Sequence, residues 1–317
     1  MNTQILSRHL DAYLALRDAL GLATRVARKL LPEFVRYLHT HSAEGPIRAH
    51  LAIDWACETS ATRGASGQAT RLTVARGFLT HLKASLPDTE IPPYSLLAAP
   101  RRAYPYLFSP TDISRILAAA ACLPPPDSLR PHTYQTVFGL LASTGLRPGE
   151  AVKLRVSDVQ LEECPPRLLI WQTKFRKSRW VPLHPTVVVQ LRQYAHRRRE
   201  LYYDGLADAF FISEQGRPLT FDSLDWTFRR LVRRLALYTQ PGHRAPSLMS
   251  FRHTFAVNRL RQWYEAGIDV RAQLPHLSVY LGHLDPTSSY WYLSATPELL
   301  GAAALRFAQY SGKGGDA

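Results

Sequence analysis

Apolar residues in the N-terminal part of the chain recur at the three- and four-residue spacing of amphipathic helices. Two such stripes fall between residues 3 and 39, and their members are Leu6, Leu10, Tyr13, Leu14 and Leu16, then Leu30, Phe34, Val35 and Leu38. Further helices are predicted over 47–57 and 70–82, with Gly64-Ala65-Ser66-Gly67 as the turn between them. The pattern predicts a bundle of about four helices.

The rest of the chain has a mainly helical pattern with one short β-hairpin. Ser109-Pro110-Thr111-Asp112 is a helix-start signal, because Ser can cap a helix and Pro fits its first turn. Segments 168–172 and 179–183 are apolar or β-prone and flank a basic turn, which favours a hairpin. Predicted helices lie at 113–120, 132–143, 151–154, 185–203, 221–237, 252–266, 275–281 and 297–309. The fold class is therefore predicted to be mainly α with a small β-sheet.

A proline-rich segment separates the two regions. It contains Pro87, Pro92, Pro93, Pro100 and Pro105, and proline disfavours helix because it lacks a backbone donor and fixes φ. We expect a helical domain over 1–90, an extended linker over 91–108 and a second domain over 109–317. The length of 317 residues is enough for two separate cores.

Charge points to a polyanionic partner. The chain carries 39 Lys and Arg against 25 Asp and Glu, a formal net charge of +14, so nucleic acid is the first candidate. A basic protein without such a partner has the same composition, so charge alone does not decide.

Three widely spaced cysteines, Cys57, Cys122 and Cys164, favour neither a disulfide framework nor a zinc site. Charged residues interrupt the apolar N-terminus, and no apolar run approaches the length of a membrane span. We expect a reducing, cytoplasmic location without membrane association.

Four short motifs carry candidate chemistry. In chain order they are TGLRPGE at 144–150, TKFRKSRWVPL at 173–183, SFRHTFA at 250–256 and LGHLDPTSSYWY at 281–292. Together they supply two arginines, a lysine, a histidine and a tyrosine. Guanidinium forks neutralise a phosphodiester and bind the charge that builds on phosphorus during attack. A tyrosine hydroxyl can make that attack and become linked to phosphate, although its pKa of about 10 requires a proton acceptor or a positive field.

The order and wording of these motifs resemble the tyrosine recombinase family, also called phage integrases, over residues 107–302. The resemblance implies a SAM-like helical core-binding domain that clamps double-stranded DNA, followed by an α+β catalytic domain. It also implies site-specific DNA cutting and rejoining through a 3′-phosphotyrosine, with no metal, nucleotide or other cofactor. Family members work as tetramers on DNA, joined through the C-terminal helix. A nucleoid-associated location follows from that substrate.

The resemblance also assigns roles to residues of this chain. Arg147, Arg252 and His283 match the residues that stabilise the pentacovalent phosphorus, and Glu150 would orient Arg147. Tyr292 matches the nucleophile, and Lys174 matches the hairpin lysine that protonates the departing 5′ oxygen. Further arginines are candidates for contacts to the DNA backbone: Arg71, Arg76, Arg101, Arg102, Arg176 and Arg179.

Some assignments stay open. Lys177 competes with Lys174 because hairpin registers slip, and Tyr290 competes with Tyr292. Met249 stands where the family usually has a histidine three positions before the second arginine, and His243 is a possible substitute. A thioether is not an acid, a base or a strong donor, so the acid–base assignment is in doubt.

His253, which follows the second arginine directly, is interpreted as a structural histidine. Two other functions share the motifs: a type IB topoisomerase that relaxes DNA without synapsis, and a DNA-binding accessory protein with impaired catalysis. A metal-dependent nuclease is disfavoured because the sequence shows no carboxylate cluster.

Overall fold

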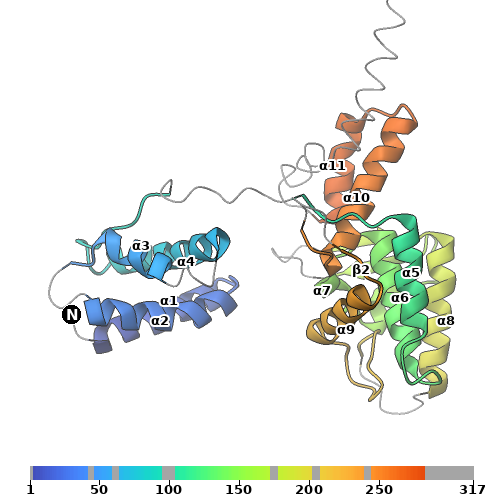
Figure 1. The fold of residues 1–317 in the computed structure, drawn as a ribbon, viewed down its shortest axis with the longest axis horizontal. Coiled ribbons are helices and arrows are strands. Elements are labelled where there is room, and N and C mark those ends of the chain that lie inside the picture. Colours follow the sequence, from blue (N-terminus) through green and yellow to red (C-terminus); the bar gives the residue numbers. More distant parts are fainter. Residues whose placement is uncertain are drawn as a thin grey trace, which may run out of the picture. The chain divides into compact units, whose positions relative to one another are not determined.

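The computed structural model describes residues 3–41, 46–58, 64–94, 104–171, 178–201, 208–238 and 244–282. The chain divides into two compact units, Met1–Arg102 and Ala103–Ala317. The division falls inside the proline-rich segment 91–108. Each unit has its own hydrophobic core, so each is described by itself (Figure 1).

The first unit contains four helices in its described residues: α1 (Thr3–Ala19), α2 (Arg25–His41), α3 (Ala49–Glu58) and α4 (Ala65–Lys83). The predicted apolar stripes point inward, and Leu31, Phe34 and Leu38 of α2 are fully buried. Phe34 packs on Trp55 of α3, with ring centroids 4.7 Å apart. The predicted bundle is thus observed.

One predicted turn in this unit is wrong. Residues 64–67 were expected to form a turn, but α4 already begins at Ala65. The N–H of Gly67 bonds to the carbonyl of Gly64 (2.8 Å), and the Thr70 hydroxyl bonds to the Ser66 carbonyl (2.9 Å). These residues therefore form the first turn of the helix, and Ala65, the best helix former among them, begins it.

The second unit is built around α6 (Leu129–Thr144), which packs against α5 (Pro110–Ala121), α8 (Pro185–Leu201) and α10 (Leu248–Glu265). Ser109 caps α5 as the sequence predicts, with Asp112 returning a bond to the Ser109 N–H. α9 (Phe221–Arg234) completes this core through Phe228, whose ring meets Phe138 of α6 and Phe251 of α10.

A small antiparallel sheet lies beside these helices. It consists of β1 (Val159–Gln160), β2 (Arg167–Ile170) and β3 (Arg179–Pro182), in that order, after a short 3-10 helix η1 (Val156–Asp158). The β2–β3 hairpin is observed as predicted, with Leu168 opposite Val181 and Ile170 opposite Arg179. Leu168, Ile170 and Val181 point into the core.

The last two described helices, α10 and α11 (Val270–Leu281), pair side by side (Figure 1) and share a smaller core of their own. α10 begins four residues before its predicted start, so Met249 lies in its first turn. α11 begins five residues early, because the Asp269 side chain caps it by accepting from the N–H groups of Arg271 and Ala272. Pro275 therefore lies inside α11 and not in its first turn.

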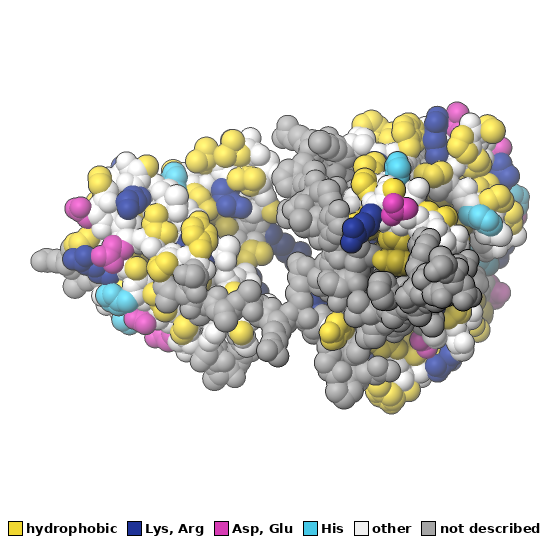
Figure 2. Space-filling model, turned by 90° about the horizontal axis from the view of Figure 1, so that it is seen from above, with side chains coloured by type: hydrophobic (Ala, Val, Ile, Leu, Met, Phe, Trp, Pro, Cys, Tyr) yellow, Lys and Arg dark blue, Asp and Glu magenta, His cyan; other side chains and the backbone are white. Residues whose placement is uncertain are grey.

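None of the described helices is long and apolar enough to cross a membrane. On the face drawn in Figure 2, the described Lys and Arg side chains occur in separate small groups among apolar and neutral ones. The net positive charge is therefore not gathered into one continuous patch on the described surface of that face.

Candidate active site

Arg147 follows the end of α6. Gly145 ends that helix in the left-handed conformation (φ +63°), and its N–H bonds to the Leu141 carbonyl (3.0 Å). A Cβ at Gly145 would lie 2.6 Å from Cδ1 of Phe255, so only glycine fits this turn. Arg147 then becomes the N-cap of the short helix α7 (Pro148–Ala151). Its side chain is 36% exposed, the most open of the three site arginines described here.

Glu150 holds Arg147 in two ways. Its Oε2 accepts the backbone N–H of Arg147 (3.0 Å), and its Oε1 accepts Nη1 of Arg147 (2.9 Å). The orienting role predicted for Glu150 thus has a geometric basis. Burial by itself would raise the pKa of Glu150, but hydrogen bonds and positive charge from Arg179 and Arg147 outweigh it and lower the pKa. The carboxylate is therefore ionised at neutral pH.

Arg179 is the second partner of Glu150. Its Nη1 and Nη2 donate to Oε1 (3.1 Å) and Oε2 (2.8 Å) of Glu150, which makes a bidentate fork. Its side chain is only 9% exposed. Sequence reasoning predicted a DNA-backbone contact here, but the structure places the guanidinium inside the domain. A charged residue in a short strand gives no local signal of a partner 29 residues away.

Three arginines converge on the C-terminal end of α11. Nε of Arg179 donates to the Tyr280 carbonyl (2.8 Å), and Nη2 of Arg252 donates to the Leu281 carbonyl (2.7 Å). Nη2 of Arg147 donates to the Gly282 carbonyl (3.1 Å). Helix C-termini carry partial negative charge and unpaired carbonyls, so guanidinium groups stabilise this end.

Arg252 joins the same turn from α10. Its side chain is 1% exposed, and besides Leu281 its Nη1 donates to the Gly145 carbonyl (2.9 Å). Gly145 lies two residues before Arg147, so the structure brings both predicted phosphate-binding arginines to one place. Arg252 is 105 positions from Arg147 in the sequence (252 − 147), and the pairing of α6 with α10 closes that distance.

The neighbouring histidine is uncharged. Burial first, and then the charges of Arg252 and Arg244, lower the pKa of His253 to about 4. Its imidazole is therefore neutral near pH 7, which agrees with the structural role predicted for it. Met249 is half-buried in the first turn of α10.

Tyr280 is the described tyrosine next to this cluster, and its chemistry does not suit attack. Its ring stacks on Phe255 at 5.6 Å, and burial raises the pKa of Tyr280 to about 12 despite Arg259 and Arg179 nearby. The phenol stays protonated at neutral pH. Sequence reasoning did not propose Tyr280, and the structure gives no reason to add it.

Several predicted residues lie outside the described residues. They are the candidate nucleophile Tyr292 and its rival Tyr290, Lys174 and its rival Lys177, His283, His243, Arg101, Arg102 and Arg176. His283 directly follows Gly282, the last described residue of the α11 turn. Their roles stay predictions.

Two predicted DNA contacts in the first unit point inward. Arg71 is 2% exposed, stacks 3.8 Å over the Trp55 ring and bonds to Glu33 (3.0 Å). Arg76 is buried and donates from Nε to the Pro92 carbonyl (2.9 Å). These bonds give both arginines a packing role within the first unit, and DNA contact by either one stays a prediction.

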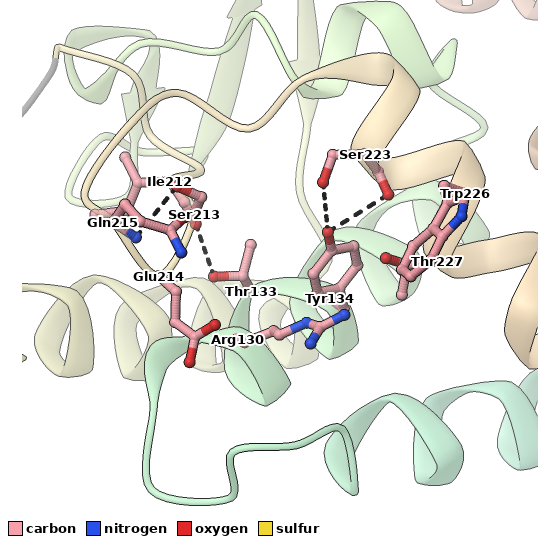
Figure 3. Close-up of a pocket in the computed structure, with 10 residues that line it drawn as sticks. All are labelled: Arg130, Thr133, Tyr134, Ile212, Ser213, Glu214, Gln215, Ser223, Trp226 and Thr227. Carbon is pink, nitrogen blue, oxygen red and sulfur yellow. Dashed lines mark hydrogen bonds between the residues drawn. The ribbon is translucent and has the colours of Figure 1, made fainter.

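A separate pocket of about 230 Å³ lies at the N-terminal end of α6 (Figure 3). It is lined by Arg130, Tyr134, Glu214 and Trp226 among others, and the buried Thr227 hydroxyl beside it has no hydrogen-bond partner among the described residues. Arg147 follows the opposite end of α6, about 25 Å away at 1.5 Å per residue. The pocket is therefore not part of the arginine cluster.

No group of three or more His, Cys, Asp and Glu side chains that could hold a metal ion occurs among the residues the structure describes. The described cluster instead consists of three arginines that donate to backbone carbonyls and to the Glu150 carboxylate.

Comparison with known proteins identifies the family of this chain. The sequence model of the phage integrase family matches residues 107–298. Two proteins of Sinorhizobium fredii, designated integrase/recombinase y4rB and y4rE, are 39% and 34% identical to this chain. The y4rB match covers 93% of this chain and 94% of the relative, and the y4rE match covers 96% of each.

A similar fold occurs in the crystal structure of the XerH site-specific recombinase bound to a palindromic difH substrate after cleavage. The TM-score is 0.66 at 18% identity, over 96% of this chain and 84% of that one.

A helical unit followed by a mainly helical unit with a small sheet, and arginines from distant motifs gathered at one turn, define the tyrosine recombinase class of DNA-cutting and -rejoining enzymes. The family model and the relatives that match over more than nine-tenths of this chain identify the same class. The chain belongs to the phage integrase family.

Proposed function

We propose that this protein is a site-specific recombinase that cuts and rejoins double-stranded DNA through a covalent 3′-phosphotyrosine. The Tyr292 oxygen attacks the scissile phosphorus, its proton passes to water, and the bond between phosphorus and the 5′ oxygen breaks. Lys174 donates a proton to that leaving oxygen, which is otherwise a poor leaving group. Attack by the 5′ hydroxyl of a partner strand reverses the step, so neither a metal nor a nucleotide is consumed.

Arg147, Arg252 and His283 stabilise the charge that develops on the phosphoryl oxygens. Guanidinium groups suit this task because they remain charged and present donors in a fixed plane. Held in place before the reaction, they bind the transition state without reorganisation. Glu150 orients Arg147 and does not touch the DNA.

The observation that carries the proposal is the turn shared by Arg147 and Arg252. Arg147 donates to the Gly282 carbonyl, and Arg252 donates to the Leu281 carbonyl next to it. Arg252 also donates to the Gly145 carbonyl. The next residue in the chain is His283. Three motifs that are far apart in sequence thus meet at one point, as a single bound phosphate requires.

DNA is the proposed partner of both units. The first unit would clamp the duplex, and the second would hold the scissile phosphate. We propose a tetramer on two duplexes, joined through the segment after Tyr292, and a nucleoid location that follows from the substrate. The XerH structure contains DNA, which supports the choice of partner.

Covalent capture tests the proposal. Full-length protein is incubated with randomised duplexes and with duplexes covering the DNA that flanks its own coding sequence, and adducts that survive denaturation are sequenced. The recovered site is then built into a nicked suicide duplex whose cleaved strand carries a label at its 5′ end. We expect an adduct in which the label is attached to Tyr292, formed equally well in EDTA. Cleavage that EDTA abolishes would instead indicate a metal-dependent nuclease.

Met249 favours a second candidate, a DNA-binding accessory protein with impaired cleavage. That protein would bind the recovered site and yield no adduct with Tyr292 intact. A type IB topoisomerase would relax plasmids that lack the site while acting as a monomer, and the same preparation can be tested for that activity.

A further inference from the structure

Arg179 is placed to act on catalysis without touching DNA. It extends from β3 into the second unit, and all three of its nitrogens donate: Nε to the Tyr280 carbonyl, and Nη1 and Nη2 to the two oxygens of Glu150. Gly282 lies against the same guanidinium, since a Cβ there would be 2.7 Å from Nη1. These contacts occupy all three nitrogens of the group, and its side chain is 9% exposed.

Glu150 is shared between two arginines. Its Oε1 accepts from the side chains of both Arg147 (2.9 Å) and Arg179 (3.1 Å), and its Oε2 accepts from Arg179 and from the Arg147 backbone. Two guanidinium groups and one carboxylate leave a local charge of +1. Without Arg179, the carboxylate would neutralise Arg147 alone, and the net charge of the Arg147–Glu150 pair would be zero.

We infer that Arg179 is a positioning residue that balances the charge of Glu150 and so leaves Arg147 free to bind the scissile phosphate. The inference rests on the function proposed above. The bond to the Tyr280 carbonyl fixes the plane of the Arg179 guanidinium, and the fork fixes the carboxylate. Glu150 then holds the Arg147 guanidinium through Nη1 only, and that side chain is partly open to solvent.

The test uses charge compensation, which a merely structural role would not produce. Four proteins are compared in single-turnover cleavage of the nicked suicide duplex at saturating concentration: wild type, Arg179→Met, Glu150→Gln and the double variant. Arg179→Met should slow cleavage by about 10- to 100-fold, because Glu150 then withdraws Arg147 from the phosphate. Adding Glu150→Gln removes the negative charge that neutralises Arg147 and should raise the cleavage rate by more than about twofold over Arg179→Met.

A surface pair that also forms a two-nitrogen fork supplies the matched control. Arg192 forks onto Glu162 (3.1 and 2.9 Å), but the two side chains are 50% and 84% exposed. Arg192→Met, with and without Glu162→Gln, should leave the cleavage rate within about twofold of wild type, because water already screens that pair.

DNA binding is measured in parallel as a function of salt. A residue that contacts phosphate lowers the slope of log K against log salt by about one when it is removed. The Arg179→Met slope should equal that of the wild type. A reduced slope would make Arg179 a DNA contact and would overturn the inference, as would a double variant that cleaves no faster than Arg179→Met.

Thermal unfolding of each variant accompanies the kinetics. If Arg179→Met does not fold, Arg179→Lys takes its place, because lysine keeps the charge and loses the fork. If Arg179 acts by balancing the charge of Glu150, the Arg179→Lys protein should cleave at a rate within about tenfold of wild type. A folded Arg179→Lys that is inactive would overturn the inference. Wild-type protein that forms no adduct would contradict the proposed function, whereas active wild type with equally active variants would contradict the role of Arg179 alone.

Discussion

Arg179 and Glu150 face each other fork to fork, with Nη1–Oε1 and Nη2–Oε2 distances of 3.1 and 2.8 Å and little of either side chain exposed. The pair joins strand β3 to the α7 turn that carries Arg147. This contact affects stability because the pair is buried: removing one member of a buried ion pair leaves the other charge without compensation. The pair is therefore expected to contribute to stability as well as to the geometry of the site.

Glu150→Gln should destabilise the second unit. The substitution leaves the guanidinium groups of Arg147 and Arg179 close together without a carboxylate between them, and we expect a loss of about 3 kcal/mol in the free energy of unfolding. Urea denaturation measures it. Glu162→Gln removes an exposed acceptor from Arg192 and should cost less than about 1 kcal/mol. Equal losses in the two variants would contradict the buried-pair account.

Gly282→Ala should lower the free energy of unfolding by more than backbone strain alone would. Gly282 has φ +69°, and an added Cβ would meet the Arg179 guanidinium at 2.7 Å. Gly267 has φ +72° with nothing within 4 Å of an added Cβ, so Gly267→Ala reports the strain alone. We expect about 1 kcal/mol for Gly267→Ala and about 1 kcal/mol more for Gly282→Ala in urea denaturation. Losses of the same size would show that Arg179 moves aside freely.

His253 should make the second unit acid-sensitive above the range where carboxylates titrate. The pKa of His253 is about 4 in the folded protein and 6.5 for a free histidine, so the unfolded chain binds the proton first as the pH falls. Stability is therefore lost between those two values and is fully present above the upper one. From about pH 7 to about pH 5 we expect a loss of about 2 kcal/mol from this group.

The His253→Gln variant isolates that contribution. Its free energy of unfolding should vary less with pH over this window than that of the wild type. Glu150 interferes little, because its pKa is lowered from the ordinary value of 4.5, so its contribution to stability is lost as the pH falls from about that value downward. Parallel curves for the two proteins would show that His253 titrates normally in the folded state.

Arg71→Met should weaken the first unit and leave DNA binding unchanged in its salt dependence. Arg71 lies over the Trp55 ring and pairs with Glu33, so its loss removes a buried cation and its stacking, worth about 3 kcal/mol in the free energy of unfolding. Arg48→Met removes an exposed pair with Glu90 and should cost less than about 1 kcal/mol. A salt slope reduced by about one in Arg71→Met would instead establish a phosphate contact.

Elements with strong local signals could be predicted from the sequence. The stripe of α2, the Ser109–Asp112 cap of α5 and the β2–β3 hairpin each depend on residues within a few positions of one another. The Gly64–Gly67 turn and the start of α11 were wrong. Small residues also fit the first turn of a helix, and Asp269 is a cap whose signal was outweighed by Pro275.

The residues of the site also divide into those that the sequence could predict and those that it could not. Arg147 and Arg252 could be singled out through their motifs, because a phosphate ester requires fixed cations, and the structure brings both to one turn; their binding of phosphate stays a prediction. The role of Arg179 could not be found, since its partners Glu150 and Tyr280 come from a helix turn and a helix end far away in sequence. Arg71 and Arg76 were taken for surface charge, because the sequence does not show that Trp55, Glu33 and the prolines of the linker enclose them.

The account depends most on Tyr292 as the nucleophile. The suicide duplex is incubated with wild type, Tyr292→Phe and Tyr290→Phe, and the covalent adduct is digested and mapped by mass spectrometry. We predict that the DNA is attached to Tyr292, that Tyr292→Phe forms no adduct, and that Tyr290→Phe forms one at a rate close to that of the wild type. A Tyr292→Phe protein that still cleaves and rejoins the duplex at the wild-type rate would contradict the proposed mechanism.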